Sequence, residues 1–198
     1  MHDGNERLAQ DVAVLSAMAE QMPEYLDSDI LYWPAPGAGM PALTLGGYLL
    51  REQRLLALRD LLTPDQRAEV DQAVTQFNQA LAGRVVRFEQ KAHHELEARL
   101  RQWEEYLKDM DRGVFDRSSN YDTAVETRAI IQALLDRLQM PPYRVEARPQ
   151  EHLSTLDKRL HGRWQPGEFI WPAEWASAYP RAAYWWLYGS PRIQEERS

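Results

Sequence analysis

The sequence predicts an all-α protein, an antiparallel helical bundle of about four to five main helices with an aromatic-rich C-terminal cap of short helices and loops. Apolar residues recur at steps of three and four over most of residues 1–140, and helix start and stop signals separate these stretches. Strong strand patterns are missing. Because 198 residues is a common size for one domain, we expect a single domain in which residues 141–198 pack on the bundle.

The first predicted helix begins where Asp3 and Glu6 stand at the separation of a capping box. Its apolar stripe continues to Met22. Pro23 then predicts a kink, because proline removes a backbone donor and clashes with the preceding turn. A second helical piece is expected over about residues 24–33.

Prolines and glycines over residues 34–41 predict a long loop. The next helix is expected over about residues 45–62, with Thr44 as the N-cap candidate. Gly46 and Gly47 make its first turn intrinsically weak.

The strongest helix start in the chain is at Thr63, where a threonine N-cap precedes a proline and the capping-box residue Gln66. An apolar stripe with heptad-like spacing then runs over residues 64–112, until Gly113 supplies a stop. One helix of this length would extend roughly 70 Å, which is longer than a compact domain of this size. Either Gly83 divides the helix or the protein is elongated.

A further helix is predicted over about residues 121–138, starting from Ser119 or Asn120 and ending before two prolines. Residues 143–147 have the pattern of a short extended piece. Residues 149–161 then predict a short helix with three regularly spaced leucines.

The C-terminal segment is unusually aromatic. Nine aromatic residues fall within residues 164–188, and prolines between them leave room for little more than short helical turns such as residues 181–188. The segment has three interpretations: a lid over one end of the bundle, a partner-binding surface, or a stacking platform for a sugar or base. Packing as a lid is the favoured one. The partner-binding interpretation rests on four tryptophans, namely Trp171, Trp175, Trp185 and Trp186.

The formal net charge of −7 opposes nonspecific binding to nucleic acid or to anionic lipid. No apolar stretch approaches the length of a membrane span, and the polar start carries no signal-peptide core. We therefore expect a cytoplasmic protein that binds neither nucleic acid nor membrane. The absence of cysteine excludes disulfides, thiolate metal sites and cysteine nucleophiles.

One group of residues has the spacing of a metal site. Glu89, His93 and Glu97 follow each other at steps of four, which places two carboxylates and an imidazole on one side of a helix, with His94 beside them. The alternative is a row of charged side chains that faces solvent. The Glu-x-x-His motif of di-iron bundles is absent. The spacing of Glu89, His93 and Glu97 alone makes a divalent metal a candidate cofactor, and no other cofactor is indicated.

Signatures of other chemistry are missing, since no nucleophile elbow and no phosphate-binding glycine loop occurs. The leading hypothesis is a noncatalytic interaction or structural protein that binds a protein partner or a second copy of itself. The alternative is a metal-dependent enzyme or small-ligand binder, with a polar site inside the bundle near Glu89, His93 and Glu97.

Overall fold

The computed structural model describes residues 2–35, 37–113 and 121–192, the side chains of residues 2 and 3 excepted. Within these ranges six α-helices carry the fold, and the one sheet described has two short strands, so the all-α prediction is confirmed. The helices are α1 (His2–Asp27), α2 (Leu45–Ala57), α3 (Pro64–Leu81), α4 (Val85–Asp111), α5 (Tyr121–Leu138) and α6 (Ala147–His161). The remaining elements are the 3₁₀ turns η1 (Arg59–Leu61), η2 (Ala173–Ala178) and η3 (Trp185–Leu187), and the strands β1 (Trp164–Phe169) and β2 (Tyr188–Pro191).

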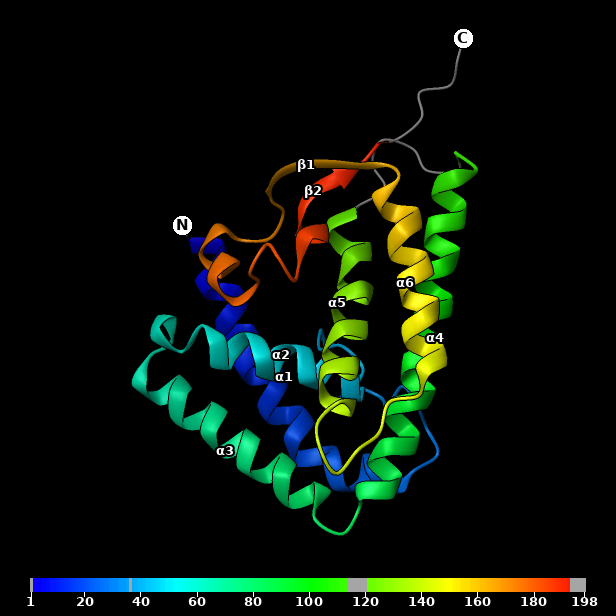
Figure 1. Cartoon of the computed structure of the whole chain (residues 1–198). Coiled ribbons are helices and arrows are strands. Elements are labelled where there is room, and N and C mark those ends of the chain that lie inside the picture. The colour runs from blue at the N-terminus through cyan, green and yellow to red at the C-terminus, as the bar shows by residue number, and fades with distance from the viewer. Residues whose placement is uncertain (1, 36, 114–120, 193–198) are drawn as a thin grey trace.

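Helix α4 forms one half of the molecule together with α5 and α6, which both pack against it (Figure 1). Helices α4 and α5 run in opposite directions, as Figure 1 shows. In the other half α1 packs against α3, and α2 joins the two halves through its contacts with α1 and α5. The apolar stripes of all six helices meet in one continuous core.

The long stripe of residues 64–112 forms two helices, not one rod. Gly83 adopts a φ of +80° between α3 and α4, a left-handed conformation that glycine reaches without steric cost. Gly113 has a φ of +68° just past the end of α4, as the stop signal predicts. Of the two alternatives for this stripe, division of the helix at Gly83 is therefore the correct one.

The separate helical piece predicted over residues 24–33 is wrong, because residues 24–27 belong to α1 and residues 28–33 are not helical. Helix α1 continues through Pro23 to Asp27, and the chain then leaves the helix. A proline inside a helix costs about 3 kcal/mol, whereas Met22 and Tyr25 beside it are fully buried and each contributes about 1.5–3 kcal/mol. Beyond the end of α1, the backbone of Trp33 forms an antiparallel bridge with that of Leu43.

The helix-start signals at Thr44 and Thr63 are confirmed. Thr44 accepts a hydrogen bond from the Gly47 N–H, and Thr63 and Gln66 form both halves of a capping box. Helix α1 already includes residue 3, and the side chain of Asp3, the predicted capping residue, lies outside the described residues. Ser119 and Asn120, the predicted start of α5, lie outside the described residues.

Residues 164–191 contain a hairpin that the sequence pattern does not predict. Strands β1 and β2 pair antiparallel, with Trp164 opposite Pro191 and Phe169 opposite Tyr188. Gly189 has a φ of +143° and a backbone so close to that of Gln165 that a Cβ atom would overlap it. The extended piece predicted over residues 143–147 forms no strand, and its last residue already belongs to α6.

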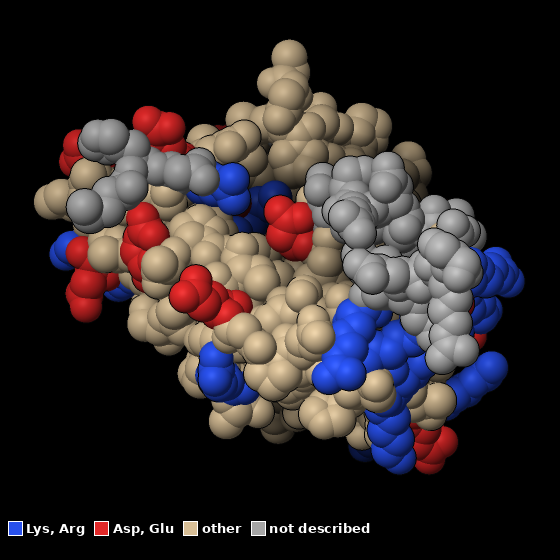
Figure 2. Space-filling view, turned by 90° about the horizontal axis from the view of Figure 1, so that it is seen from above, with Lys and Arg blue, Asp and Glu red and all other residues tan. Residues whose placement is uncertain are grey.

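The aromatic segment packs on the bundle through an arginine. The turn η2 lies against α1 and α2, and the buried Arg54 of α2 donates a 2.8 Å hydrogen bond to the hydroxyl of Tyr179. The Arg54 guanidinium also lies 4.3 Å from the ring centre of Trp175. Trp175 and Trp186 are buried, as a lid requires. Figure 2 looks down on the end of the molecule where this segment lies and shows a mostly uncharged surface, with basic side chains gathered at one side of it.

Candidate functional site

An open groove of about 1140 Å³ follows one side of α4, and we call it the α4 groove. It has a floor from one helix and walls from two segments that are distant in sequence. The floor consists of α4 residues Arg87, Glu89, Gln90, Lys91, His93, His94, Glu97 and Arg101. One wall is formed by Leu26, Ser28, Asp29 and Leu31, and the other by Arg144, Val145 and Glu146.

Lys91 fixes the first wall to α4. Its ammonium group donates hydrogen bonds to the carbonyls of Ser28, at 2.9 Å, and of Ile30, at 2.8 Å. It also lies 4.3 Å from the ring centre of Tyr25. Carbonyls beyond the end of a helix lack helical partners, so a lysine placed there satisfies them. Desolvation lowers the pKa of Lys91.

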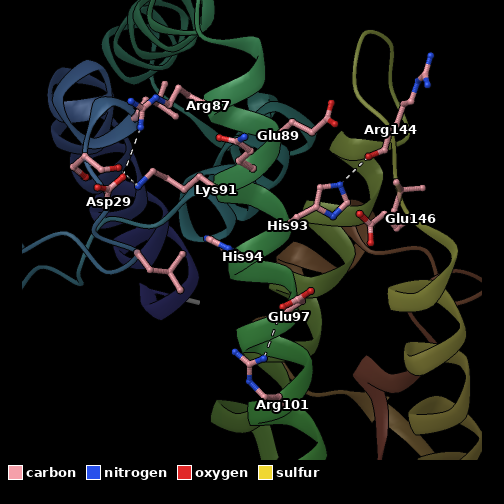
Figure 3. A pocket seen from close by; sticks show the side chains of 15 residues that line it. Asp29, Arg87, Glu89, Lys91, His93, His94, Glu97, Arg101, Arg144 and Glu146 are labelled. Atoms are coloured by element: carbon pink, nitrogen blue, oxygen red, sulfur yellow. Dashed lines mark hydrogen bonds and ion pairs between the residues drawn. The ribbon is translucent and has the colours of Figure 1, made fainter.

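His93 fixes the second wall. Its Nε2 atom lies 2.9 Å from the carbonyl oxygen of Arg144. Because a carbonyl oxygen can only accept, Nε2 carries the hydrogen and donates a hydrogen bond to it. Figure 3 shows Glu146 on the same side of the groove as His93, while the side chain of Arg144 extends outward. The guanidinium of Arg144 is therefore exposed to solvent at the outer edge of the groove.

All three predicted metal-ligating residues, Glu89, His93 and Glu97, line this groove. The groove lies on the surface and not inside the bundle, and the side chain of Glu97 is 57% exposed. Glu97 pairs with Arg101 at 3.9 Å, and His93 uses one ring nitrogen for the wall. Among the described residues, no three or more His, Asp or Glu side chains gather closely enough to hold a metal ion.

The groove carries charges of both signs in alternation. Asp29 and Arg87 pair at 3.7 Å across the first wall, and both side chains face solvent. Glu89 and Arg144 form no ion pair with a described residue. The groove thus offers both an acid and a base that are not already neutralised.

Ser28 is the one hydroxyl side chain among the groove residues, and it completes the end of α1. Its Oγ donates to the carbonyl of Tyr25 at 2.8 Å and accepts from the N–H of Ile30 at 3.3 Å. A serine nucleophile needs a base that takes its proton. The Ser28 hydroxyl instead forms hydrogen bonds with the backbone of the turn that follows α1.

The four tryptophans of the predicted partner surface divide into two pairs. Trp175 and Trp186 are buried, whereas Trp171 and Trp185 are partly exposed. Trp171 donates a 3.3 Å hydrogen bond to the carbonyl of Asp122. Only the second pair offers ring surface to a partner, so partner binding by this segment stays a prediction for Trp171 and Trp185.

A pair of charged residues that the sequence reasoning missed lies on another side of α4, where Glu95 contacts α2. Glu95 is fully buried and accepts a 2.9 Å hydrogen bond from the Gly46 N–H, and Arg99 pairs with it at 3.3 Å. Burial raises the pKa of Glu95, while Arg99 and the bond from Gly46 oppose this. The sequence does contain a pattern that predicts the burial of Glu95. It stands seven residues after Phe88, which places both residues on the same face of the helix.

Comparison of the chain with models of known protein families, with curated protein sequences and with solved structures finds no match. In the described part of the chain, no helix is both long enough and apolar enough to cross a membrane. The α4 groove and the contacts around it therefore carry the functional argument.

Proposed function

We propose that this chain is a noncatalytic interaction protein and that the α4 groove binds a segment of a protein partner. One observation carries the proposal: charges of both signs alternate along an open groove whose walls are held in place by Lys91 and His93. Complementary charges determine which partner binds and in which register. A groove with alternating signs fits a peptide that carries both.

The size and the chemistry of the groove support a peptide over the other partner classes. Its volume of about 1140 Å³ exceeds the usual range for small-molecule pockets. Polymers of one sign, such as nucleic acids, would meet Glu89, Glu97 and Glu146 as well as the basic residues. A segment with alternating charges meets no such repulsion.

Apolar side chains near the groove offer further contact area. Ile30 stands between the first-wall residues Asp29 and Leu31 and is 49% exposed, and Val86 is 68% exposed at the start of α4. Lys91 donates a hydrogen bond to the carbonyl of Ile30 and so holds the backbone of this residue close to α4. Exposed apolar groups beside charged ones are typical of protein interfaces.

A display library of random peptides, selected against the wild-type chain, tests the proposal. Enriched peptides are expected to carry both acidic and basic residues. They should bind Arg144→Glu at least tenfold more weakly, a loss of about 1.4 kcal/mol, because the variant reverses a charge that no described residue neutralises. The matched control is Arg148→Glu, which makes the same change at an exposed position outside the groove.

Crosslinking places the bound peptide. The chain contains no cysteine, so Gln90→Cys provides one attachment point in the groove for a photo-crosslinker, and Arg148→Cys provides one outside it. We expect peptide capture from position 90 alone. Selection without any binder, or binders that tolerate Arg144→Glu and crosslink equally from both positions, would overturn the proposal.

A further inference from the structure

We propose a second binding site, independent of the α4 groove, in which a neutral saccharide binds between α5 and α6. A groove of about 590 Å³ lies between these helices, and we call it the α5–α6 groove. This volume is within the ordinary range of small-ligand sites. The polar and aromatic side chains that line it include Arg128, Asp157, Gln139, Gln150, Ser154 and Trp185.

The groove exists because α5 and α6 both pack on α4 and are joined to each other by an ion pair. The guanidinium of Arg128 donates to both carboxylate oxygens of Asp157, at 3.0 and 2.9 Å. Arg128 also donates to the amide oxygen of Gln132 at 3.1 Å, and the Gln132 amide nitrogen donates to Asp136 at 2.8 Å. These bonds fix the orientation of the Arg128, Asp157 and Gln132 side chains.

The ion pair gives the groove polar groups that are already oriented. The side chain of Arg128 is 4% exposed, whereas that of Asp157 is 23% exposed. A buried ion pair contributes little net stability compared with apolar residues. Each carboxylate oxygen of Asp157 uses one lone pair for Arg128 and keeps another, which can accept a hydrogen bond from a ligand hydroxyl.

Three neutral polar side chains line the rest of the groove. Gln139, Gln150 and Ser154 are exposed, and their side chains form no hydrogen bond with a described residue. Amides and hydroxyls both donate and accept, as sugar hydroxyls do. The charges of Arg128 and Asp157 cancel, so this fixed pair favours an uncharged ligand, while the exposed Lys158 adds one positive charge to the lining.

Trp185 supplies the apolar surface that a sugar ring requires. The indole is partly exposed, and its centre lies 5.2 Å from that of Trp164 and 5.0 Å from that of His161, both in edge-on arrangements. These two neighbours hold the ring in place at the end of the groove. A pyranose has an apolar C–H face and a rim of hydroxyls, which match a fixed indole beside amides and a carboxylate.

Calorimetric titration of the wild-type chain with cellobiose, maltose, lactose, diacetylchitobiose and glucuronic acid tests the site. At least one neutral disaccharide is expected to bind. Gln139→Ala and Gln150→Ala should each weaken this binding about fivefold, the effect of one lost hydrogen bond. Both residues are exposed, so these variants should keep the wild-type Tm, whereas Trp185→Ala also removes packing against Trp164.

Gln90→Ala is the matched control, because it removes the same amide from the α4 groove and should leave sugar binding unchanged. Three outcomes would overturn the inference: no neutral disaccharide binds at up to about 10 mM, only the acidic sugar binds, or the variants at positions 139 and 150 bind as tightly as the wild type. None of these outcomes bears on the peptide proposal, since that test uses Arg144→Glu.

Discussion

The carboxylate of Glu95 accepts a 2.9 Å hydrogen bond from the backbone N–H of Gly46, so a fully buried acid of α4 lies at the first turn of α2. The N-terminus of a helix has unpaired N–H groups and a partial positive charge, and both stabilise a carboxylate there. The glycines that weaken this turn on their own thus permit a contact between α2 and α4.

Gly46→Ala is expected to destabilise the protein. A Cβ atom at this position would overlap Ile130 of α5 and would lie 2.9 Å from the Glu95 carboxylate. Alanine favours a helix by about 1 kcal/mol over glycine, but overpacking a core costs about 1–3 kcal/mol. We therefore expect a lower free energy of unfolding, measured by urea denaturation.

Gly37→Ala is the control for this change. The nearest atom to a Cβ at position 37 is the Met40 sulfur at 3.8 Å, an ordinary contact distance. Its free energy of unfolding should stay within about 0.5 kcal/mol of wild type. A Gly46→Ala protein as stable as the control would show that α2 and α5 can separate without cost.

Glu52→Gln is expected to stabilise the protein at neutral pH. Glu52 is buried and accepts no hydrogen bond from a described residue, and desolvation raises its pKa although the charge of Arg137 opposes this. A carboxyl whose pKa is higher in the folded state than in the unfolded state costs stability once it ionises. Replacing it with a neutral isostere removes this cost, by about 1 kcal/mol or more.

The pH dependence of this difference gives the sign check. Below the ordinary glutamate pKa, Glu52 is protonated in both states, so variant and wild type should be equally stable. The advantage of Glu52→Gln should grow as the pH rises from the ordinary glutamate pKa to the raised pKa of the folded state, and stay constant above it. Thermal unfolding from pH 3.5 to 8 measures it, and an advantage that is equal at all pH values would mean that ionisation of Glu52 is not its cause.

Asp11→Asn is expected to lower the free energy of unfolding by about 3 kcal/mol, because it leaves buried guanidinium groups without a counter-charge. Asp11 pairs with Arg54 at 2.6 Å and with Arg51 at 3.1 Å, and all three side chains are largely buried. Since Arg54 also holds Tyr179, tryptophan quenching by acrylamide should increase as the C-terminal segment loosens.

Asp71→Asn is the matched control, since Asp71 also pairs with an arginine at 2.6 Å, but on the surface. Exposed pairs contribute about 0–1 kcal/mol. Equal losses in the two variants would contradict the role we assign to burial.

The parts of the fold that the sequence predicted are those set by local chemistry. The capping box at Thr63 and the glycine stops at Gly83 and Gly113 depend on a few neighbouring residues, and the structure has each of them. The end of α1 was missed because burial of Tyr25 outweighs the effect of Pro23. That balance depends on which helix packs there, and a local pattern does not contain this information.

For the candidate site too, the sequence predicts what depends on local spacing and misses what depends on long-range packing. Helical spacing correctly places Glu89, His93 and Glu97 along one groove, because all three belong to one helix. The opposite wall, from Arg144 to Glu146, reaches them only through the turn after α5. Contacts such as that of Arg54 with Tyr179, which are 125 residues apart, are equally invisible to local spacing.

Zinc chloride is expected to leave the Tm unchanged, which tests the metal hypothesis directly. Zinc takes four ligands at close to tetrahedral geometry, whereas Glu89 and Glu97 lie one turn to either side of His93, whose Nε2 already contacts the carbonyl of Arg144. A ligand at 100 times its Kd would stabilise the folded state by about 2.7 kcal/mol. That would raise the Tm of a chain of this size by about 5–10 °C.

His93→Gln and His152→Gln serve as paired variants, because His152 also contacts a glutamate, Glu104, at 3.3 Å outside the groove. If zinc raises the Tm of the wild type and of His152→Gln but not of His93→Gln, the groove binds metal through His93, and metal binding would replace the peptide proposal for this site.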